Sequence, residues 1–200
     1  YLKGDFSHAI SSFKSVINLD SKYAKGYFNL AKVLKENGDI TKAKHFLKNV
    51  ININPKYTEA LNLLGNIYKD EGNIDKASSC YKNAIKSNNN HCEAYNNLGN
   101  MYLEKSNYEK AISCFKNSLK INPSYLEAYN NLGITLQAIG RLHQAISVFK
   151  KAIDIDSNFG TAIWNLSYAQ LLLGDYKSGW ENYEWRDKTN EPILPHARPK

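Results

Sequence analysis

The chain has 200 residues, of which 42% are hydrophobic, and its formal net charge is +7. Five prolines and eleven glycines are too few for a disordered or fibrous protein, and no stretch approaches the roughly 18 apolar residues of a membrane span. The composition is therefore sufficient for a packed core of one or two domains.

The start of the sequence and its cysteines bear on the class of protein. The chain begins with Tyr1 and no charged-then-apolar leader follows, so we expect a fragment whose true N-terminus precedes Tyr1. Three cysteines without a C-x-x-C pair indicate reduced thiols, and we expect a cytoplasmic location. The five histidines stand singly, so the sequence predicts no metal site and no cofactor.

One pattern returns every 34 residues from end to end of the chain, without an insertion. The step joins leucines, small residues, alanines and large apolar residues into separate columns. They are Leu30, Leu64, Leu98, Leu132 and Leu166; Ala31, Gly65, Gly99, Gly133 and Ser167; Ala9, Ala43, Ala77, Ala111, Ala145 and Gly179; and Phe13, Leu47, Tyr81, Phe115, Phe149 and Tyr183. Self-similarity at a fixed period of this length is the signature of stacked structural repeats.

In chain order, this register predicts six units and a tail. A partial unit takes residues 1–23, complete units follow at 24–57, 58–91, 92–125 and 126–159, and a last unit takes 160–188, before a linker or tail at 189–200. The partial unit is half a hairpin. The others are expected to be helical hairpins at 25–54, 59–88, 93–122, 127–156 and 161–188, so the sequence predicts an all-α chain without strands.

Two apolar stripes within a unit indicate its two helices. In the unit 92–125, Tyr95, Leu98, Gly99 and Tyr102 have the spacing i, i+3, i+4, i+7 of one helical face, and a second stripe begins at Ala111. The small-residue column, Gly99 in this unit, should let the first helix approach its partner closely.

The turns and helix ends carry signals of their own. Between the two helices of a hairpin stand Gly38, Gly72, Ser106, Gly140 and Gly174. Glycine, or an asparagine such as Asn107, can adopt the left-handed conformation that ends a helix. Ser124 and Glu127 have capping-box spacing at the start of the first helix of the next unit, 126–159.

These residues resemble the tetratricopeptide repeat family. The resemblance is carried by Tyr-x-x-Leu-Gly-x-x-Tyr at residues 95–102, followed by Ala111, Phe115 and Pro123, and it covers residues 1 to about 188 in register. It implies a right-handed α-solenoid, a superhelix of stacked antiparallel hairpins whose first helices line the concave face. No hairpin buries its apolar face alone, so its neighbours supply the core.

If the family geometry holds, the face of each first helix opposite the buried stripe lines a groove for a protein or an extended peptide. The predicted peptide-binding residues on this face are Asn29, Asn66, Asn97, Asn100, Asn131 and Asn165. An asparagine amide offers donors and an acceptor, so such a ladder can pair with main-chain peptide units with little regard to sequence. The column Asn29, Asn97, Asn131 and Asn165 resembles the asparagine ladder that lines the superhelix of the O-linked N-acetylglucosamine transferase family, and Leu63 interrupts this column here.

Other interpretations of these residues stay open. Asparagine is abundant throughout this chain, so the ladder can also reflect composition alone. The basic charge leaves nucleic-acid binding as a less favoured alternative, because most lysines lie on the predicted second helices, the convex side, and not along one track. A clamp for a C-terminal carboxylate is disfavoured, because Glu93 and Glu127 stand where cations are required.

The last unit differs from the others. Its sequence L-x-x-G-D-Y-x-x-G-W-x-x-Y-E-W-R, from Leu171 to Arg186, resembles the closing repeat of bacterial proteins whose repeats precede a glycosyltransferase-like domain. The resemblance implies such a domain in cis, joined through the tail 189–200. The residues predicted to pack against that domain, or to cap the solenoid, are Trp164, Tyr168, Leu172, Trp180, Tyr183 and Trp185.

The sequence contains no catalytic constellation. It has no Gly-rich phosphate loop and no G-x-S-x-G element, so no enzyme activity is expected of this fragment, and that of the parent protein stays open. The interpretation is a non-catalytic scaffold for proteins or peptides, the substrate- or partner-binding arm of a larger glycosyltransferase-like protein. A stand-alone assembly adaptor is the alternative, and no membrane partner is expected.

Overall fold

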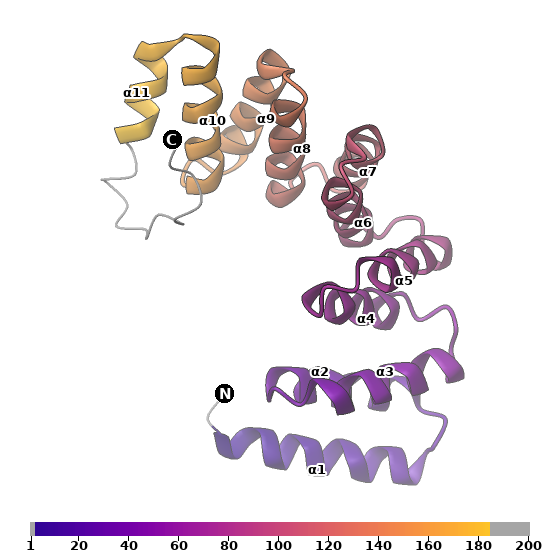
Figure 1. The fold of residues 1–200 in the computed structure, drawn as a ribbon. Helices are drawn as coiled ribbons and strands as arrows, with labels where there is room; N and C mark the ends of the chain where they lie inside the picture. The colour runs from indigo at the N-terminus through magenta and orange to yellow at the C-terminus, as the bar shows by residue number, and fades with distance from the viewer. Residues whose placement is uncertain (1–2, 185–200) are drawn as a thin grey trace. The chain divides into compact units, whose positions relative to one another are not determined.

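The computed structural model describes residues 3–184, with side chains from Phe6 onward. These residues form eleven α-helices and no strand (Figure 1). The helices are α1 (Lys3–Leu19), α2 (Ala24–Glu36), α3 (Ile40–Ile53), α4 (Thr58–Asp70), α5 (Ile74–Ser87), α6 (Cys92–Glu104), α7 (Tyr108–Ile121), α8 (Leu126–Ala138), α9 (Leu142–Ile155), α10 (Gly160–Leu173) and α11 (Tyr176–Glu184). The first helices of the predicted hairpins each begin one residue earlier than expected, at residues 24, 58, 92, 126 and 160.

The helices belong to two units, which divide between Met101 and Tyr102 within α6. In the first unit α1 packs on α2, α2 on α3, α3 on α4 and α4 on α5. In the second unit the same order holds from α7 to α11, and α10 also contacts α8, the first helix of the preceding hairpin. Each unit is therefore a stack of hairpins, and the predicted fold class, an all-α solenoid of hairpins, is confirmed.

The 34-residue columns form the core. The alanines Ala43, Ala77, Ala111 and Ala145 and the large side chains Leu47, Tyr81, Phe115 and Phe149 are all completely buried. A first helix approaches its partner closely where its small residue faces the large one: in α8, Gly133 lies directly against the ring of Phe149. Burying one large side chain from water contributes about 1.5–3 kcal/mol, so these columns hold each hairpin together.

The turn inside each hairpin has a left-handed residue. Gly38, Gly72, Gly140 and Gly174 have φ between 73° and 88°, and Ser106 occupies the same place with φ 55°. An Asx side chain then begins the second helix in every hairpin but that of α9, where Arg141 stands at the cap position without a side-chain cap. Asp39, Asn73, Asn107 and Asp175 each accept a hydrogen bond from the backbone N–H three residues later. Such caps satisfy one of the free N–H groups of a helix start.

The linkers between hairpins are also built locally. Asp20, Asn54, Asn88, Asn122 and Asp156 each accept a hydrogen bond from the backbone N–H two residues later, at 2.9–3.0 Å. One sequence prediction is wrong at this point. Ser124 does not cap α8: its N–H donates to Asn122, and the cap position belongs to Tyr125, whose side chain makes no capping bond.

Two sequence predictions fall partly outside the described residues. Trp185 and the tail 189–200 lie beyond Glu184, and the last hairpin is described only as far as that residue. Among the helices that are described, none is long and apolar enough to cross a bilayer.

Candidate functional site

The asparagines predicted to bind peptide lie on the first helices, where they are half-buried. In the first unit these are Asn29 on α2, Asn66 on α4, and Asn97 and Asn100 on α6. The charged residues at the ends of the same faces, such as Glu59 and Asp70 on α4, are exposed. On α4 the half-buried Asn66 therefore lies between solvated charges at the two ends of the helix.

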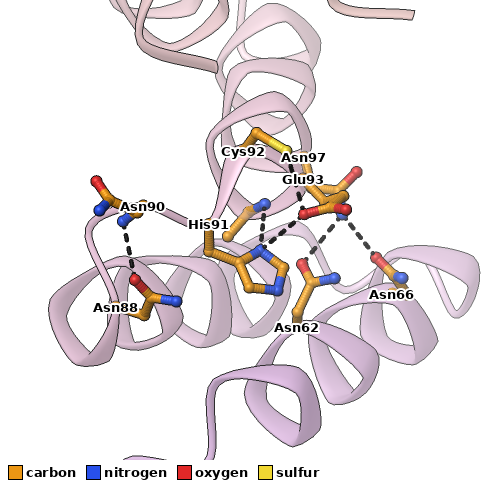
Figure 2. A network of polar contacts seen from close by, with 9 residues as sticks. Asn62, Asn66, Asn88, Asn90, His91, Cys92, Glu93 and Asn97 are labelled. Atoms are coloured by element: carbon orange, nitrogen blue, oxygen red, sulfur yellow. Dashed lines mark hydrogen bonds and ion pairs between the residues drawn. The ribbon is translucent and has the colours of Figure 1, made fainter. Parts of the chain in front are cut away.

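Asn97 forms the centre of a hydrogen-bond network between two first helices (Figure 2). Its Nδ2 donates to Oδ1 of Asn62 at 3.2 Å and to Oδ1 of Asn66 at 3.1 Å. The amide group has two N–H donors, and these two bonds use both of them within the protein. The structure thus brings together two of the asparagines predicted to bind peptide, Asn66 and Asn97, which we call rungs of the ladder. They hydrogen-bond to each other in addition to facing solvent.

The network continues into the core through Tyr81 of α5. The Tyr81 hydroxyl donates to Oδ1 of Asn66 at 2.8 Å, while its ring is completely buried against Gly65. Burial raises the pKa of the Tyr81 phenol above its ordinary value, and the carboxylate of Asp70 adds to the shift. The hydroxyl is therefore protonated at neutral pH and serves as a donor.

A second polar group lies at the start of α6, one turn before Asn97 (Figure 2). Nδ1 of His91 accepts a hydrogen bond from the backbone N–H of Ala94 at 3.2 Å. The Glu93 carboxylate lies 3.2 Å from the same nitrogen and accepts a hydrogen bond from the Cys92 thiol at 3.4 Å. His91 thus caps α6, and the Glu93 carboxylate lies beside the His91 ring.

In the second unit, a hydrogen bond also joins asparagines of neighbouring first helices. Asn165 on α10 donates to Oδ1 of Asn130 on α8 at 2.8 Å, which repeats the bond from Asn97 to Asn62 two repeats later. Asn131 on α8 is half-buried, and its backbone carbonyl accepts the Thr135 hydroxyl at 2.7 Å. Where the first unit has Asn66 and Tyr81, the second has Ile134 and Phe149.

Sequence reasoning did not single out Asn62, Asn130 or Tyr81. A signal for the first two existed, because Asn62, Asn96 and Asn130 form a 34-residue column of their own. Tyr81 stands in an apolar column, so its hydroxyl could be assigned a partner only with the helices in place.

The last hairpin carries an aromatic cluster and an exposed apolar surface. Trp164 and Trp180 contact Tyr183 with ring centroids 5.1 and 5.3 Å apart. Beside them, five large side chains are between 37% and 65% exposed, and we name them the terminal apolar surface: Tyr168, Leu172, Leu173, Tyr176 and Trp180. Of the predicted capping residues, the structure thus gathers Trp164, Trp180 and Tyr183, and leaves Tyr168 and Leu172 exposed.

Two cysteines lie near the network, and neither is activated. Burial raises the pKa of the Cys80 thiol to about 11, and burial together with the Glu93 carboxylate raises the pKa of Cys92. A thiol nucleophile needs a lowered pKa. Among residues 6–184, no group of three or more His, Cys, Asp or Glu side chains could hold a metal ion.

Several lysines pack on tyrosines along the hairpins. The Nζ atoms of Lys44 and Lys76 lie 5.9 and 5.5 Å from the ring centre of Tyr68, and that of Lys110 lies 5.6 Å from Tyr102. Lys44 also pairs with Glu71. These three cations therefore pack on tyrosine rings of their own chain.

Family models for one helical repeat match most of the chain. Models described as "Tetratricopeptide repeat" match residues 24–57 and 90–158, and a model described as "TPR repeat" matches residues 65–106. No curated protein matches the sequence.

Solved structures share the fold at low sequence identity. YrrB, a TPR protein with an unusual peptide-binding site, is 18% identical with a TM-score of 0.75, covering 92% of this chain and 95% of YrrB. PilW, a type IV pilus biogenesis factor, is 18% identical with a TM-score of 0.81, covering 93% and 86%. MamA from Desulfovibrio magneticus RS-1 is 22% identical with a TM-score of 0.75, covering 84% and 97%.

Proposed function

Because this chain is a tetratricopeptide repeat protein over residues 24–57 and 65–158, we propose that it is a non-catalytic scaffold that binds extended protein segments. The ligand lies along the first helices and pairs through its main chain with Asn29, Asn66, Asn97, Asn100, Asn131 and Asn165. One observation carries the proposal: every first helix from α2 to α10 has at least one half-buried asparagine on this face.

Amide groups suit this role because each can donate and accept a hydrogen bond, as a peptide unit does. The half-buried position favours it further, since a hydrogen bond shielded from water is electrostatically stronger than an exposed one. The printed description of YrrB, which shares the fold, names a peptide-binding site in that protein, and this supports a peptide as the class of ligand.

The finer proposal concerns the place of the chain in a larger protein. We infer that it is the partner- or substrate-binding arm of a glycosyltransferase-like protein, whose further domain follows the last hairpin and covers the terminal apolar surface. Support comes from the sequence between Leu171 and Arg186 and from the exposure of Leu172 and Trp180, at 52% and 53%. Apolar patches of this kind usually mark interfaces, and aromatic residues often anchor them.

Alanine substitution of two rungs tests the proposed groove. Asn97→Ala with Asn131→Ala removes one rung from each unit, and the matched control is Asn83→Ala with Asn117→Ala, exposed asparagines of second helices at the same 34-residue spacing. Binding is measured by fluorescence anisotropy with several labelled, uncharged peptides of unrelated sequence. We expect the rung variant to weaken all of them by similar factors, about 1 kcal/mol per lost bond, and the control to leave them unchanged.

Two outcomes would contradict the proposal. Unchanged affinity in the rung variant would show that Asn97 and Asn131 do not bind the ligand. Loss of one peptide with normal binding of the others would show that side chains of the ligand, and not its main chain, are recognised.

A further inference from the structure

The junction of α4, α5 and α6 has a polar feature at a place where α3, α7 and α9 have only apolar side chains. Among the completely buried large side chains Leu47, Tyr81, Phe115 and Phe149, which occupy the same place on α3, α5, α7 and α9, only Tyr81 has a hydroxyl. A buried hydroxyl without a partner costs about 1–3 kcal/mol, and this one donates to Asn66 at 2.8 Å. The repeat fold itself does not require this bond, because Phe occupies the same column twice.

The hydroxyl fixes the orientation of the Asn66 amide. Oδ1 of Asn66 accepts from both Tyr81 and Asn97, at 2.8 and 3.1 Å, so its Nδ2 must lie on the other side of the amide plane. Turning this amide over would place its N–H groups against the donor of Asn97. Two bonds at one oxygen therefore hold one of the two amide orientations.

The orientation of the Asn66 amide determines that of the Asn97 amide, which in turn determines that of Asn62. Asn97 uses both N–H donors, on Asn62 and Asn66, and so keeps Oδ1 as its remaining hydrogen-bonding atom. Asn62 accepts through Oδ1 and keeps Nδ2. The three amides together therefore present two donor groups from α4 and one acceptor from α6, as the side chains in Figure 2 are arranged.

A main-chain peptide group has the complementary set, one carbonyl oxygen and one N–H. We propose that this junction is the anchoring subsite of the groove for one peptide unit, and that Tyr81 is its positioning residue. The ligand carbonyl accepts from Nδ2 of Asn62 or Asn66, and the ligand N–H donates to Oδ1 of Asn97. The inference rests on the proposed function and adds the place and polarity of its strongest contact.

The second unit provides an internal comparison. There Asn165 donates to Asn130 at 2.8 Å, but Ile134 and Phe149 replace the amide and the hydroxyl that orient the network in the first unit. An amide held by a single bond rotates more freely and has to be ordered when the ligand binds, which costs entropy. Affinity for main chain is therefore concentrated in the first unit.

Tyr81→Phe tests the inference, because it removes the hydroxyl and keeps the ring. Phenylalanine already occupies the equivalent positions 115 and 149, so the change suits the core. The matched control is Tyr68→Phe, on the half-buried Tyr68 of α4, whose ring packs with Lys44 and Lys76. The probes are labelled, uncharged, proline-free peptides of about 12 residues, which span roughly 40 Å when extended. Thermal unfolding of each variant is followed in parallel.

We expect Tyr81→Phe to raise the dissociation constants of all probes by about 3- to 10-fold, the range for one hydrogen bond. Tyr68→Phe should leave them unchanged. In the background of Asn66→Ala, Tyr81→Phe should have no further effect on binding, since Tyr81 acts through Asn66. A role of Tyr81 in packing alone would lower the melting temperature equally in both backgrounds and would not give this coupling.

The outcomes separate this inference from the proposed function. If the unmodified chain binds the probes and Tyr81→Phe binds them equally well, the anchoring subsite is wrong and the scaffold proposal stands. If the effects of Tyr81→Phe and Asn66→Ala on binding simply add, Tyr81 does not position Asn66. If the unmodified chain binds no probe, both proposals fail.

Discussion

Gly65 lies under the ring of Tyr81, so closely that a Cβ atom on Gly65 would be 2.6 Å from Cε1 of Tyr81. Real Cβ contacts are essentially never that short, so with any larger residue the Tyr81 ring or the two helices have to shift. In the preceding hairpin, the same two positions hold Ala31 and Leu47, both completely buried. A small residue on the first helix and a large one on the second are therefore matched in size.

The first prediction follows from this match. Gly65→Ala should lower the free energy of unfolding by about 1–3 kcal/mol, the usual cost of an overpacked core. Combining it with Tyr81→Leu recreates the Ala31 and Leu47 pair and should cost less than the sum of the two single changes. Urea unfolding of the four proteins measures the coupling, and strictly additive losses would show that the two residues do not share one contact.

The second prediction concerns the turn at Ser106, which has φ 55° where the other hairpins have glycine. A left-handed conformation costs a residue with a side chain roughly 1–2 kcal/mol, and glycine gives back part of this through its freer unfolded state. Ser106→Gly should therefore stabilise the chain by up to about 1 kcal/mol. The reverse change, Gly72→Ser at φ 73°, should destabilise it, and thermal unfolding of both variants checks the pair.

The third prediction addresses the terminal apolar surface. Leu172 is 52% exposed in the midst of this surface, whereas Leu19 is 90% exposed at the end of α1. If the surface is an interface, the lone chain self-associates through it, and Leu172→Glu should raise the monomer fraction in sedimentation velocity. Leu19→Glu is the matched control and should not change it. Equal monomer content in all three proteins would leave the aromatic residues as a cap of the last hairpin.

The fourth prediction uses the Cys80 thiol, whose pKa burial raises to about 11 from an ordinary value of 9.0. Since the folded state disfavours the thiolate, its contribution to stability is complete below pH 9 and is lost as the pH rises through about 11. Chemical unfolding between these values should therefore show a steeper loss of stability for the unmodified chain than for Cys80→Ala. Parallel curves for the two proteins would mean that Cys80 ionises equally in both states.

Much of this fold could be predicted from the sequence, because each structural position of the hairpin recurs every 34 residues with the same kind of side chain. The helix bounds followed from columns such as Leu30 and Leu64, and small residues marked close contacts. The cap predicted at Ser124 is wrong because α8 begins one residue later than that cap requires, with Tyr125 at the cap position.

The hydrogen-bond network could not be predicted in the same way. It depends on which atoms of Asn62, Asn66 and Asn97 meet across helices more than 30 residues apart in sequence, and spacing along one helix carries no information about amide orientation. The role of the asparagines as peptide ligands thus stays a prediction, although their mutual contacts are now known.

The linkers between hairpins have a consequence for how the length of such a chain can change. Each is closed by an Asx side chain that binds a backbone N–H two residues ahead, so this bond forms within the linker itself. Deleting residues 55–88 would join Asn54 to Asn89 and restore Asn-Asn-Asn-His, the sequence now at 88–91. Whole hairpins are thus modules that recombination can add or remove at the cost of a single new junction, and the number of first helices that carry an asparagine can change by one without redesign of the rest.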